Sequence, residues 1–306
     1  MPLPDFLSVA DCSPAQLKRL LSRASDLRNG KPAPQVLKGK SVALLFQKPS
    51  LRTKLSFDLA VHQLGGHAVF MSPDEVGIGK REPIEDVARV LDRYVDCIVA
   101  RVFGHDLVEK LAHYAKVPVI NALSDGEHPC QALADLQTAQ ECLGPLKGKT
   151  IAFIGDGNNC ASSLALGAAM LGVNFRIASP EGYELREQVA VKVRAFAKAS
   201  GGTFVEARSP QEAVQAADVV YTDVWTSMGQ EEEAQKRRKA FVGYQVNAGL
   251  MAKAKKSAIF LHPLPAHHGE ELGIGMLEHP ASRVFHQAGN RLHAQKALLL
   301  EIFGKA

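Results

Sequence analysis

The sequence lacks the features of disulfide-bonded and zinc-finger proteins. Its five cysteines are odd in number, and no two of them form a Cys-x-x-Cys pair. A disulfide framework or a structural zinc site usually needs thiols paired at short spacing. The amino terminus also lacks a basic segment followed by an apolar run, which would mark a secretory signal. These absences predict a protein of the reducing cytoplasm.

The sequence also has no long hydrophobic run and few aromatic residues. Its most apolar stretch, residues 164–171, is far shorter than the roughly 20 residues of a membrane-spanning helix, so we interpret it as a buried helix. A basic run at residues 236–239 has no interleaved aromatic residues, and the net charge is a mild +4. We interpret this run as a solvated helix face. The sequence therefore predicts neither a membrane nor a nucleic-acid partner.

What is present is an alternation of short apolar runs with longer amphipathic segments, which is typical of a parallel sheet with helices on its faces. The expected strands cover residues 42–46, 68–71, 97–102, 117–120, 151–154, 175–178, 219–222 and 258–261. Two segments, Ser13-Pro14-Ala15-Gln16 and Ser209-Pro210-Gln211-Glu212, each combine a capping serine with a proline at the first helical position. Both segments predict helix starts.

The chain is long enough for two domains of ordinary size. A link rich in helix breakers, residues 143–149, follows a predicted helix over 129–142. We therefore predict an α/β fold with two doubly wound parallel-sheet domains, residues 1–142 and 143–289, and a C-terminal helix at 290–306 that packs back on the first. In such sheets ligands bind beyond the carboxyl ends of the strands, so the residues there are candidates.

In the first half, three such segments carry polar side chains. Ser50, Arg52 and Thr53 stand where a strand ends and a helix begins, and a helix amino terminus with a nearby arginine favours an anion. Arg101 ends an apolar strand, and His128 precedes a helix that begins at a proline. Each segment alone has an ordinary structural interpretation, a capped helix or a buried histidine. Three of them after neighbouring strands favour one anion site.

In the second half, the turn after residues 151–154 reads Gly155-Asp156-Gly157-Asn158-Asn159-Cys160. A dinucleotide site would have glycine where Cys160 stands, although Glu181 lies near the spacing of a ribose-binding acid. Asp223 ends a buried strand and could anchor an ammonium group. His262, His267 and His268 lie close together in the sequence, but adjacent histidines rarely converge on one ion, so we predict no metal site.

Together these segments resemble the aspartate/ornithine carbamoyltransferase family, and its ornithine branch in particular. The resemblance covers nearly the whole chain and rests on the motifs SLRT, ARVF, HPCQALAD, GDGNN, DVWTSMGQE, HPLPAHHGEE and AGNRLHAQKA. It implies transfer of a carbamoyl group from carbamoyl phosphate to L-ornithine, giving L-citrulline and phosphate in arginine biosynthesis. It also implies a cytoplasmic homotrimer that uses these small molecules and neither a metal nor an organic cofactor.

The resemblance assigns roles to individual residues. Those implied to bind carbamoyl phosphate are Ser50, Leu51, Arg52, Thr53, Arg101, His128, Gln131, Pro263, Leu264 and Arg291. Those implied to bind ornithine are Asn159, Asp223, Ser227 and Met228. The implied catalytic residues are Arg52, Arg101, His128, Asp223 and Pro263. The Leu264-Pro265 bond is expected to be cis, with its carbonyls turned toward the carbamoyl nitrogen.

Three departures from the family pattern leave alternatives open. Leu51 replaces a threonine of the phosphate loop, and Pro263 replaces the cysteine of the ornithine branch. Gly77 stands where a neighbouring subunit would lend a polar residue, so Lys80 or Arg81 could substitute. Aspartate, putrescine or an N-acylated ornithine could therefore be the acceptor, although Asp223 disfavours aspartate. A catalytically silent paralogue that binds carbamoyl phosphate is a further alternative.

Overall fold

A computed structural model describes residues 3–78, 81–227 and 229–304. The chain forms two compact units, one of Met1–Gln137 with Gly289–Ala306 and one of Thr138–Ala288. Each unit contains its own parallel sheet, with helices between successive strands. The predicted α/β class with two doubly wound sheets is confirmed.

The sheet of the first unit has the order β2-β1-β3-β4. Its parallel strands are β1 (Ser41–Phe46), β2 (His67–Met71), β3 (Cys97–Arg101) and β4 (Val119–Leu123). From β1 the chain runs outward to β2 and then crosses back to β3. The strand order therefore reverses between β1 and β3, which is where ligands bind in doubly wound sheets.

Helices cover this sheet on both faces. They are α1 (Pro14–Arg28), α2 (Leu51–Gln63), α3 (Pro73–Val76), α4 (Ile84–Leu91), α5 (His105–Tyr114) and the first part of α6 (Pro129–Leu143), with a 3-10 turn, η1 (Val9–Asp11). Ala43 and Leu45 of β1 pack with α4 and α5 in one buried cluster. The predicted capping box of α1 is confirmed, because Ser13 and Gln16 exchange side-chain and backbone hydrogen bonds.

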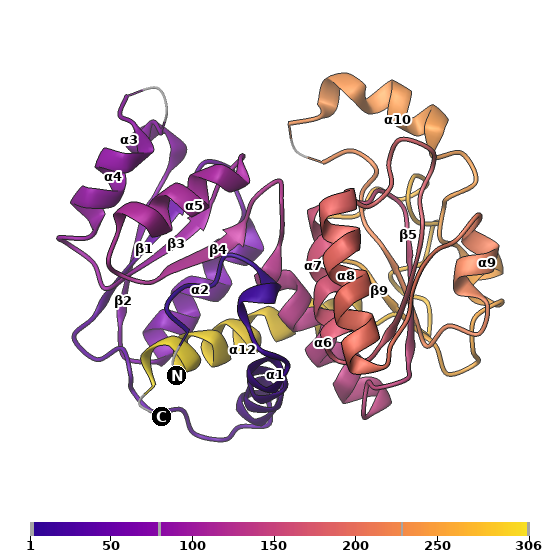
Figure 1. The fold of residues 1–306 in the computed structure, drawn as a ribbon, viewed down its shortest axis with the longest axis horizontal. Coiled ribbons are helices and arrows are strands. Elements are labelled where there is room, and N and C mark those ends of the chain that lie inside the picture. Colours follow the sequence, from indigo (N-terminus) through magenta and orange to yellow (C-terminus); the bar gives the residue numbers. More distant parts are fainter. Residues whose placement is uncertain (1–2, 79–80, 228, 305–306) are drawn as a thin grey trace. The chain divides into compact units, whose positions relative to one another are not determined.

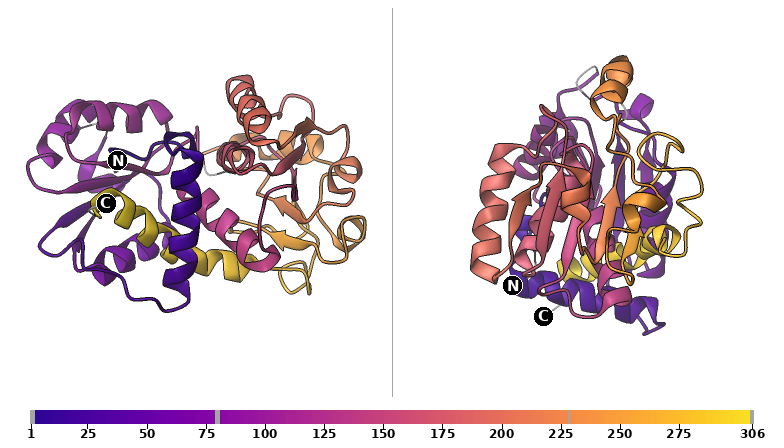
Figure 2. Two further views of the ribbon diagram at one scale, coloured as in Figure 1. Left: turned by 60° about the horizontal axis from the view of Figure 1, so that its bottom comes forward. Right: turned by 90° about the vertical axis from the view of Figure 1, so that its right-hand side faces the viewer.

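The last helix, α12 (Val284–Phe303), begins earlier than the predicted residue 290. Its carboxyl-terminal part lies beside α1 in the first unit, as the yellow and indigo ribbons of Figures 1 and 2 show. Arg19 forms an ion pair with Glu301 at 2.7 Å, and the Arg28 guanidinium donates to Asn290 at 2.7 Å. The C-terminal helix therefore packs on the first unit as predicted.

The second unit has the sheet order β7-β6-β5-β8-β9. Its parallel strands are β5 (Thr150–Ile154), β6 (Asn174–Ala178), β7 (Phe204–Glu206), β8 (Val219–Thr222) and β9 (Ile259–Leu261). Its helices include α7 (Asn159–Met170), α8 (Glu187–Ser200), α9 (Pro210–Val214), α10 (Ala234–Ala240) and α11 (Ala248–Met251), with a 3-10 turn, η2 (Glu231–Glu233). Figure 1 shows α7 and α8 on one side of the strands and α9 on the other.

Two strand predictions need correction. β4 covers Val119–Leu123 rather than residues 117–120, because Pro118 has no N–H to donate and the pairing with β3 begins after it. β7 was not predicted, since it has three residues at a sheet edge and little burial. Among the described residues, no helix has the length and low polarity that crossing a bilayer requires.

Candidate active site

The segment between β1 and α2 forms the turn at which the sequence predicts an anion site. Ser50 is the N-cap of α2, and its Oγ accepts a hydrogen bond from the Thr53 N–H at 3.2 Å. The first-turn N–H groups of a helix have no partner within the helix, and they carry the positive end of its dipole. Arg52 is half-buried beside them, whereas the side chain of Leu51 is 77% exposed. The turn therefore offers backbone donors and one guanidinium to an anion.

Arg291 of α12 connects this turn to α6. Its guanidinium donates to Thr53 Oγ1 at 3.2 Å and to Gln131 Oε1. Gln131 in turn donates to Asp135 Oδ1 at 2.7 Å. All four side chains are buried. Residues predicted from three distant segments thus share one network within the first unit.

Arg101 and His128 complete this cluster. Arg101 is the last residue of β3 and is buried, and its carbonyl accepts from the Gln47 N–H at 2.8 Å, which ties it to the turn after β1. Burial holds the pKa of His128 well below its usual value of 6.5, and the positive charges of Arg291, Arg101 and Arg52 lower this pKa further. The first unit therefore places three guanidinium groups within electrostatic reach of the His128 imidazole, an arrangement suited to a phosphorylated carbonyl compound.

In the second unit, the turn after β5 meets the end of β8. Asn158 is the N-cap of α7, and its amide donates to Asp223 Oδ2 at 2.8 Å. Asp223 Oδ1 accepts from the Val224 N–H at 2.8 Å, and the residue is only 7% exposed. Asn159, the predicted ligand, is the first residue of α7 and is half-buried. Asn158 was not singled out from the sequence, although its place before a helix is the signal for a cap.

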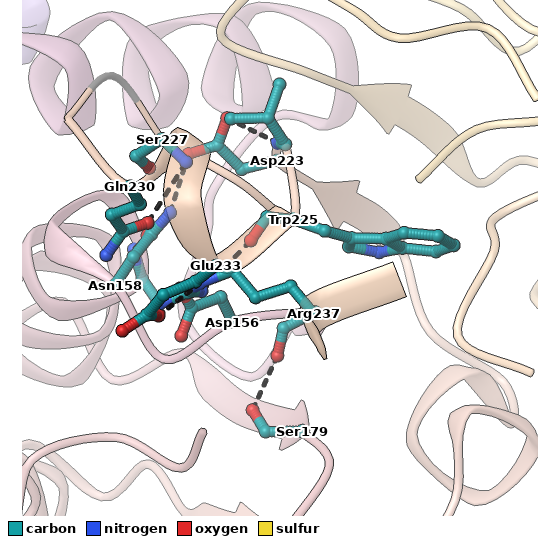
Figure 3. A network of polar contacts seen from close by, with 12 residues as sticks. Asp156, Asn158, Ser179, Asp223, Trp225, Ser227, Gln230, Glu233 and Arg237 are labelled. Atoms are coloured by element: carbon teal, nitrogen blue, oxygen red, sulfur yellow. Dashed lines mark hydrogen bonds and ion pairs between the residues drawn. The ribbon is translucent and has the colours of Figure 1, made fainter. Parts of the chain in front are cut away.

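The hydrogen-bond partners of Asp223 are uncharged, so its carboxylate can still pair with a cation. Its hydrogen bonds come from an amide side chain and a backbone N–H, and no ion pair to it is found in the described part of the chain. A buried carboxylate is stable only with strong donors or a cation. Asp223 is therefore suited to bind an ammonium group. Ser227 lies in the same close view, where its N–H donates to Gln230 Oε1 at 3.1 Å (Figure 3).

Arg237 of α10 belongs to the same network of polar contacts (Figure 3). Its guanidinium donates to Asp156 Oδ2 at 2.7 Å, to the Trp225 carbonyl at 3.0 Å and to Glu233 Oε2 at 3.2 Å. The interpretation of residues 236–239 as a solvated face is therefore wrong for Arg237, which is buried, while its three neighbours are exposed. Pairing with Asp156 offsets the cost of that burial.

The loop after β9 has the predicted cis bond between Leu264 and Pro265. His262 Nδ1 accepts from the Leu264 N–H at 2.9 Å, so Nε2 carries the proton that faces Glu271 Oε1 at 3.2 Å. The same Glu271 oxygen accepts from the His267 N–H at 2.6 Å. Pro263, by contrast, is a buried residue with no side-chain polar atom. The loop is thus fixed at both ends by one carboxylate.

A group with metal-ligand chemistry also lies on this loop. Ligand atoms of His267, Glu270 and Glu271 lie within 4.8 Å of one another. Two carboxylates thus lie near His267. Glu270 pairs with Arg238 at 2.9 Å and Glu271 Oε1 with His262, so both acids already have protein partners and we propose no metal there.

Two predicted positions, Met228 and Lys80, lie outside the described residues. Gly77 ends α3 with φ at 57°, in the left-handed region that glycine tolerates. Arg81 is exposed and lies 3.8 Å from Glu82. The substitution of Lys80 or Arg81 for a missing polar residue stays a prediction.

The chain is similar to known carbamoyltransferases over its whole length. The sequence model of the aspartate/ornithine carbamoyltransferase carbamoyl-P binding domain matches residues 4–141, and that of the Asp/Orn binding domain matches residues 147–302. An ornithine carbamoyltransferase from Anoxybacillus flavithermus is 51% identical over 302 residues, which are 97% of this chain and 96% of that protein. One from Thermococcus kodakarensis is 49% identical over 304 residues, 98% of this chain and 96% of the relative.

Solved structures agree with these sequence matches. The ornithine carbamoyltransferase from Pyrococcus furiosus superposes with a TM-score of 0.95 at 47% identity, covering 100% of this chain and 98% of that one. The one from Thermus thermophilus has a TM-score of 0.88 at 46% identity, with 98% and 99% covered. The chain therefore belongs to the aspartate/ornithine carbamoyltransferase family.

Proposed function

We propose that this protein transfers the carbamoyl group of carbamoyl phosphate to the δ-amine of L-ornithine, giving L-citrulline and phosphate. The observation that carries the proposal is the cluster of Arg52, Arg101 and Arg291 around the buried, neutral His128. The length and identity of the match to ornithine carbamoyltransferases support the choice of acceptor.

In the proposed carbamoyl-phosphate half, the phosphate binds at the amino terminus of α2. The backbone N–H groups there and the Arg52 guanidinium are its donors, with Ser50 and Thr53 shaping the turn. Arg101 and His128 donate to the carbamoyl oxygen, and the Gln131 side chain accepts from the carbamoyl nitrogen. Leu51 contributes its backbone, because its exposed side chain has no donor.

In the proposed ornithine half, Asp223 binds the α-ammonium group. Asn158 holds the Asp223 carboxylate in place, and Asn159 and Ser227 supply donors to the α-carboxylate. We assign Met228 to the same group from the resemblance alone. Pro263 and Leu264 offer backbone carbonyls to the carbamoyl nitrogen.

The proposed reaction is a direct displacement. The neutral δ-amine attacks the carbamoyl carbon, the carbonyl oxygen becomes an oxyanion, and the C–O bond to phosphate breaks while the leaving phosphate takes the proton from nitrogen. Arg101 and the neutral His128 stabilise the oxyanion, and Arg52 stabilises the charge on the leaving group. The proposal needs neither a metal ion nor an organic cofactor.

Asp223 favours ornithine over the alternative acceptor amines. Aspartate would bring a second carboxylate toward this buried acid, although Pro263 matches the aspartate branch of the family. An N-acylated ornithine lacks the α-ammonium that Asp223 would bind, and putrescine lacks the α-carboxylate. A silent paralogue would bind carbamoyl phosphate and form no product. Each acceptor rival therefore either lacks one of the two α groups or brings an extra carboxylate next to Asp223.

A steady-state assay with an amine panel tests the proposal. The purified chain is given carbamoyl phosphate with ornithine, N-acetylornithine, putrescine or aspartate, and carbamoylated product is measured for each. We expect the highest kcat/KM with ornithine, at least about tenfold above the others, since one lost charged contact costs about that much or more. A higher kcat/KM with any other amine would identify that amine as the acceptor in place of ornithine. If none of the four amines gave a carbamoylated product, the silent paralogue would be favoured.

We further propose a homotrimer that works in arginine biosynthesis in the cytoplasm. An exposed apolar stripe on α2 supports assembly: Leu51, Leu55 and Leu59 are 77%, 51% and 37% exposed and stand four residues apart, on one helix face. Contiguous exposed leucines favour an interface between chains. The stripe begins at the phosphate turn, so a second copy seated on it would lie next to that turn.

A further inference from the structure

The amino-terminal segment is attached to the free edge of β4. Phe6 is fully buried and forms a parallel bridge with Ile120. The Phe6 N–H donates to the Val119 carbonyl, and the Asn121 N–H donates to the Phe6 carbonyl, both at 2.8 Å. The segment therefore follows β4 toward its carboxyl end, where the residues before α6 begin.

At that end the segment binds the carboxylate of Glu127. Ser8 Oγ donates to Glu127 Oε1, and the Val9 N–H donates to Glu127 Oε2 at 3.2 Å. Glu127 is only 8% exposed, and it directly precedes His128 in the chain. The carboxylate thus links the amino-terminal segment to the backbone that carries the histidine.

The opposite side of this loop, residues 124–128, is fixed by α5. His105 Nδ1 lies 2.7 Å from Ser124 Oγ, and the Ser124 N–H donates to the Glu127 carbonyl at 2.9 Å. A Cβ atom on Gly126 would stand 2.7 Å from Cγ of the His105 ring. The loop is therefore held by α5 on one side and by the amino-terminal segment on the other.

We propose that Glu127 is a positioning residue for carbamoyl transfer, which holds His128 where its imidazole donates to the carbamoyl oxygen. Glu127 acts through the backbone of this loop and touches no substrate. The inference rests on the proposed function of the first unit. Because His128 is neutral, its single N–H is effective only when it points at the developing oxyanion, and misplacement of about 1 Å can cost on the order of 10²-fold in rate.

Kinetic comparison of four single variants and the Ser8→Ala/Glu127→Ala double variant tests this role. Glu127→Ala removes the bonds to Ser8 and Val9, Ser8→Ala removes the first of these, and Glu127→Gln keeps two polar atoms in the same shape. The matched control is Asp96→Ala, because Asp96 accepts from Lys40 Nζ and the Ser41 N–H at the opposite end of the sheet. For each chain, kcat, the KM for each substrate and the melting temperature are measured.

We expect Glu127→Ala to lower kcat/KM for carbamoyl phosphate by about 10- to 100-fold with the KM for ornithine within about twofold of wild type. Glu127→Gln should recover part of the loss, and Ser8→Ala should add nothing in the Glu127→Ala background. Asp96→Ala should lower the melting temperature without this kinetic change.

Two results would overturn the inference. One is wild-type kcat/KM for carbamoyl phosphate in Glu127→Ala, and the other is an equal loss in Asp96→Ala, which would make the effect merely structural. Failure of the proposed function has a different signature, since the wild-type chain itself would then form no citrulline. In that case the affinity for phosphonoacetamide, a carbamoyl phosphate analogue, is measured by calorimetry for wild type and Glu127→Ala. Weaker binding to Glu127→Ala would show that Glu127 orders the site, and equal binding would show that it does not.

Discussion

Arg52 is the residue whose removal tests the carbamoyl-phosphate half with least damage to the fold. It is half-buried in the first turn of α2, and its neighbour Leu51 is exposed, so Arg52→Ala leaves the core intact. We expect kcat/KM for carbamoyl phosphate to fall by about 10²- to 10³-fold, as for loss of one donor to a developing anion. The melting temperature should stay close to that of wild type. Turnover near the wild-type rate would remove Arg52 from the mechanism.

His128 gives a prediction about pH. The pKa of His128 in the folded chain lies well below the usual 6.5, which applies to the unfolded chain. At a pH between these two pKa values, the unfolded chain binds a proton that the folded chain does not. The free energy of unfolding should therefore fall as pH drops below about 6.5, by at most about 1.4 kcal/mol per pH unit from this residue. Above pH 6.5 the effect should vanish.

Urea unfolding of wild type and His128→Asn at pH 7.5 and 5.5 checks the sign. The loss of stability on acidification should be smaller in His128→Asn, because asparagine does not titrate. Equal losses in both proteins would mean that His128 is not held neutral by burial and by its arginine neighbours.

Single residues also show how far the sequence could predict the site. Ser50, Thr53, Gln131 and Arg291 share one network; Ser50 and Thr53 were candidates from their place after a strand, whereas Arg291 was assigned by the family resemblance alone. Asn158 was overlooked because its bond to Asp223 joins residues 65 positions apart. The burial of Arg237 was likewise hidden, since its partner Asp156 stands 81 positions away. Local patterns cannot specify such pairs.

At the scale of elements, α10 offers a matched pair of charges for a stability test. Arg237 is buried against Asp156, whose pKa is raised first by burial, whereas Arg238 is exposed and pairs with Glu270. We expect Arg237→Gln to lower the free energy of unfolding by about 3 kcal/mol, because it leaves Asp156 buried without its cation. Arg238→Gln should change it by less than about 1 kcal/mol.

Urea unfolding monitored by Trp225 fluorescence measures both changes, since Trp225 is the single tryptophan and its carbonyl accepts from Arg237. Equal effects of the two variants would show that Arg237 is no better bound than a surface arginine. The ranking depends on burial alone, as both substitutions remove one positive charge from the same helix.

Elements were predictable where a local signal was strong. Serine caps followed by proline gave the starts of α1 and α9, because those hydrogen bonds close within three residues. β7 was missed, because three residues at a sheet edge give no hydrophobic pattern. The start of α12 at Val284 was also missed, because the sequence before it lacks the serine-proline signal that marks α1 and α9.

At the scale of the whole molecule, the α2 stripe predicts the assembly. Leu55→Lys/Leu59→Lys should prevent trimer formation, because it places two charges on the apolar face that we propose joins the chains. Light scattering after size exclusion should give about three times 33.0 kDa for wild type and a lower mass for the variant. Val191→Lys is the control, since Val191 is 55% exposed on α8 of the second unit. A monomeric wild type, or an unaltered mass in the double variant, would contradict this interface.

The central claim is that the carbamoyl carbon of carbamoyl phosphate ends on the δ-nitrogen of ornithine. The most direct test follows that carbon: the chain is mixed with carbon-13-labelled carbamoyl phosphate and L-ornithine, and the products are identified by NMR. We expect the label in the ureido carbon of citrulline, with one phosphate released for each citrulline formed. Label found only in the spontaneous breakdown products of carbamoyl phosphate, at the rate seen without protein, would contradict it.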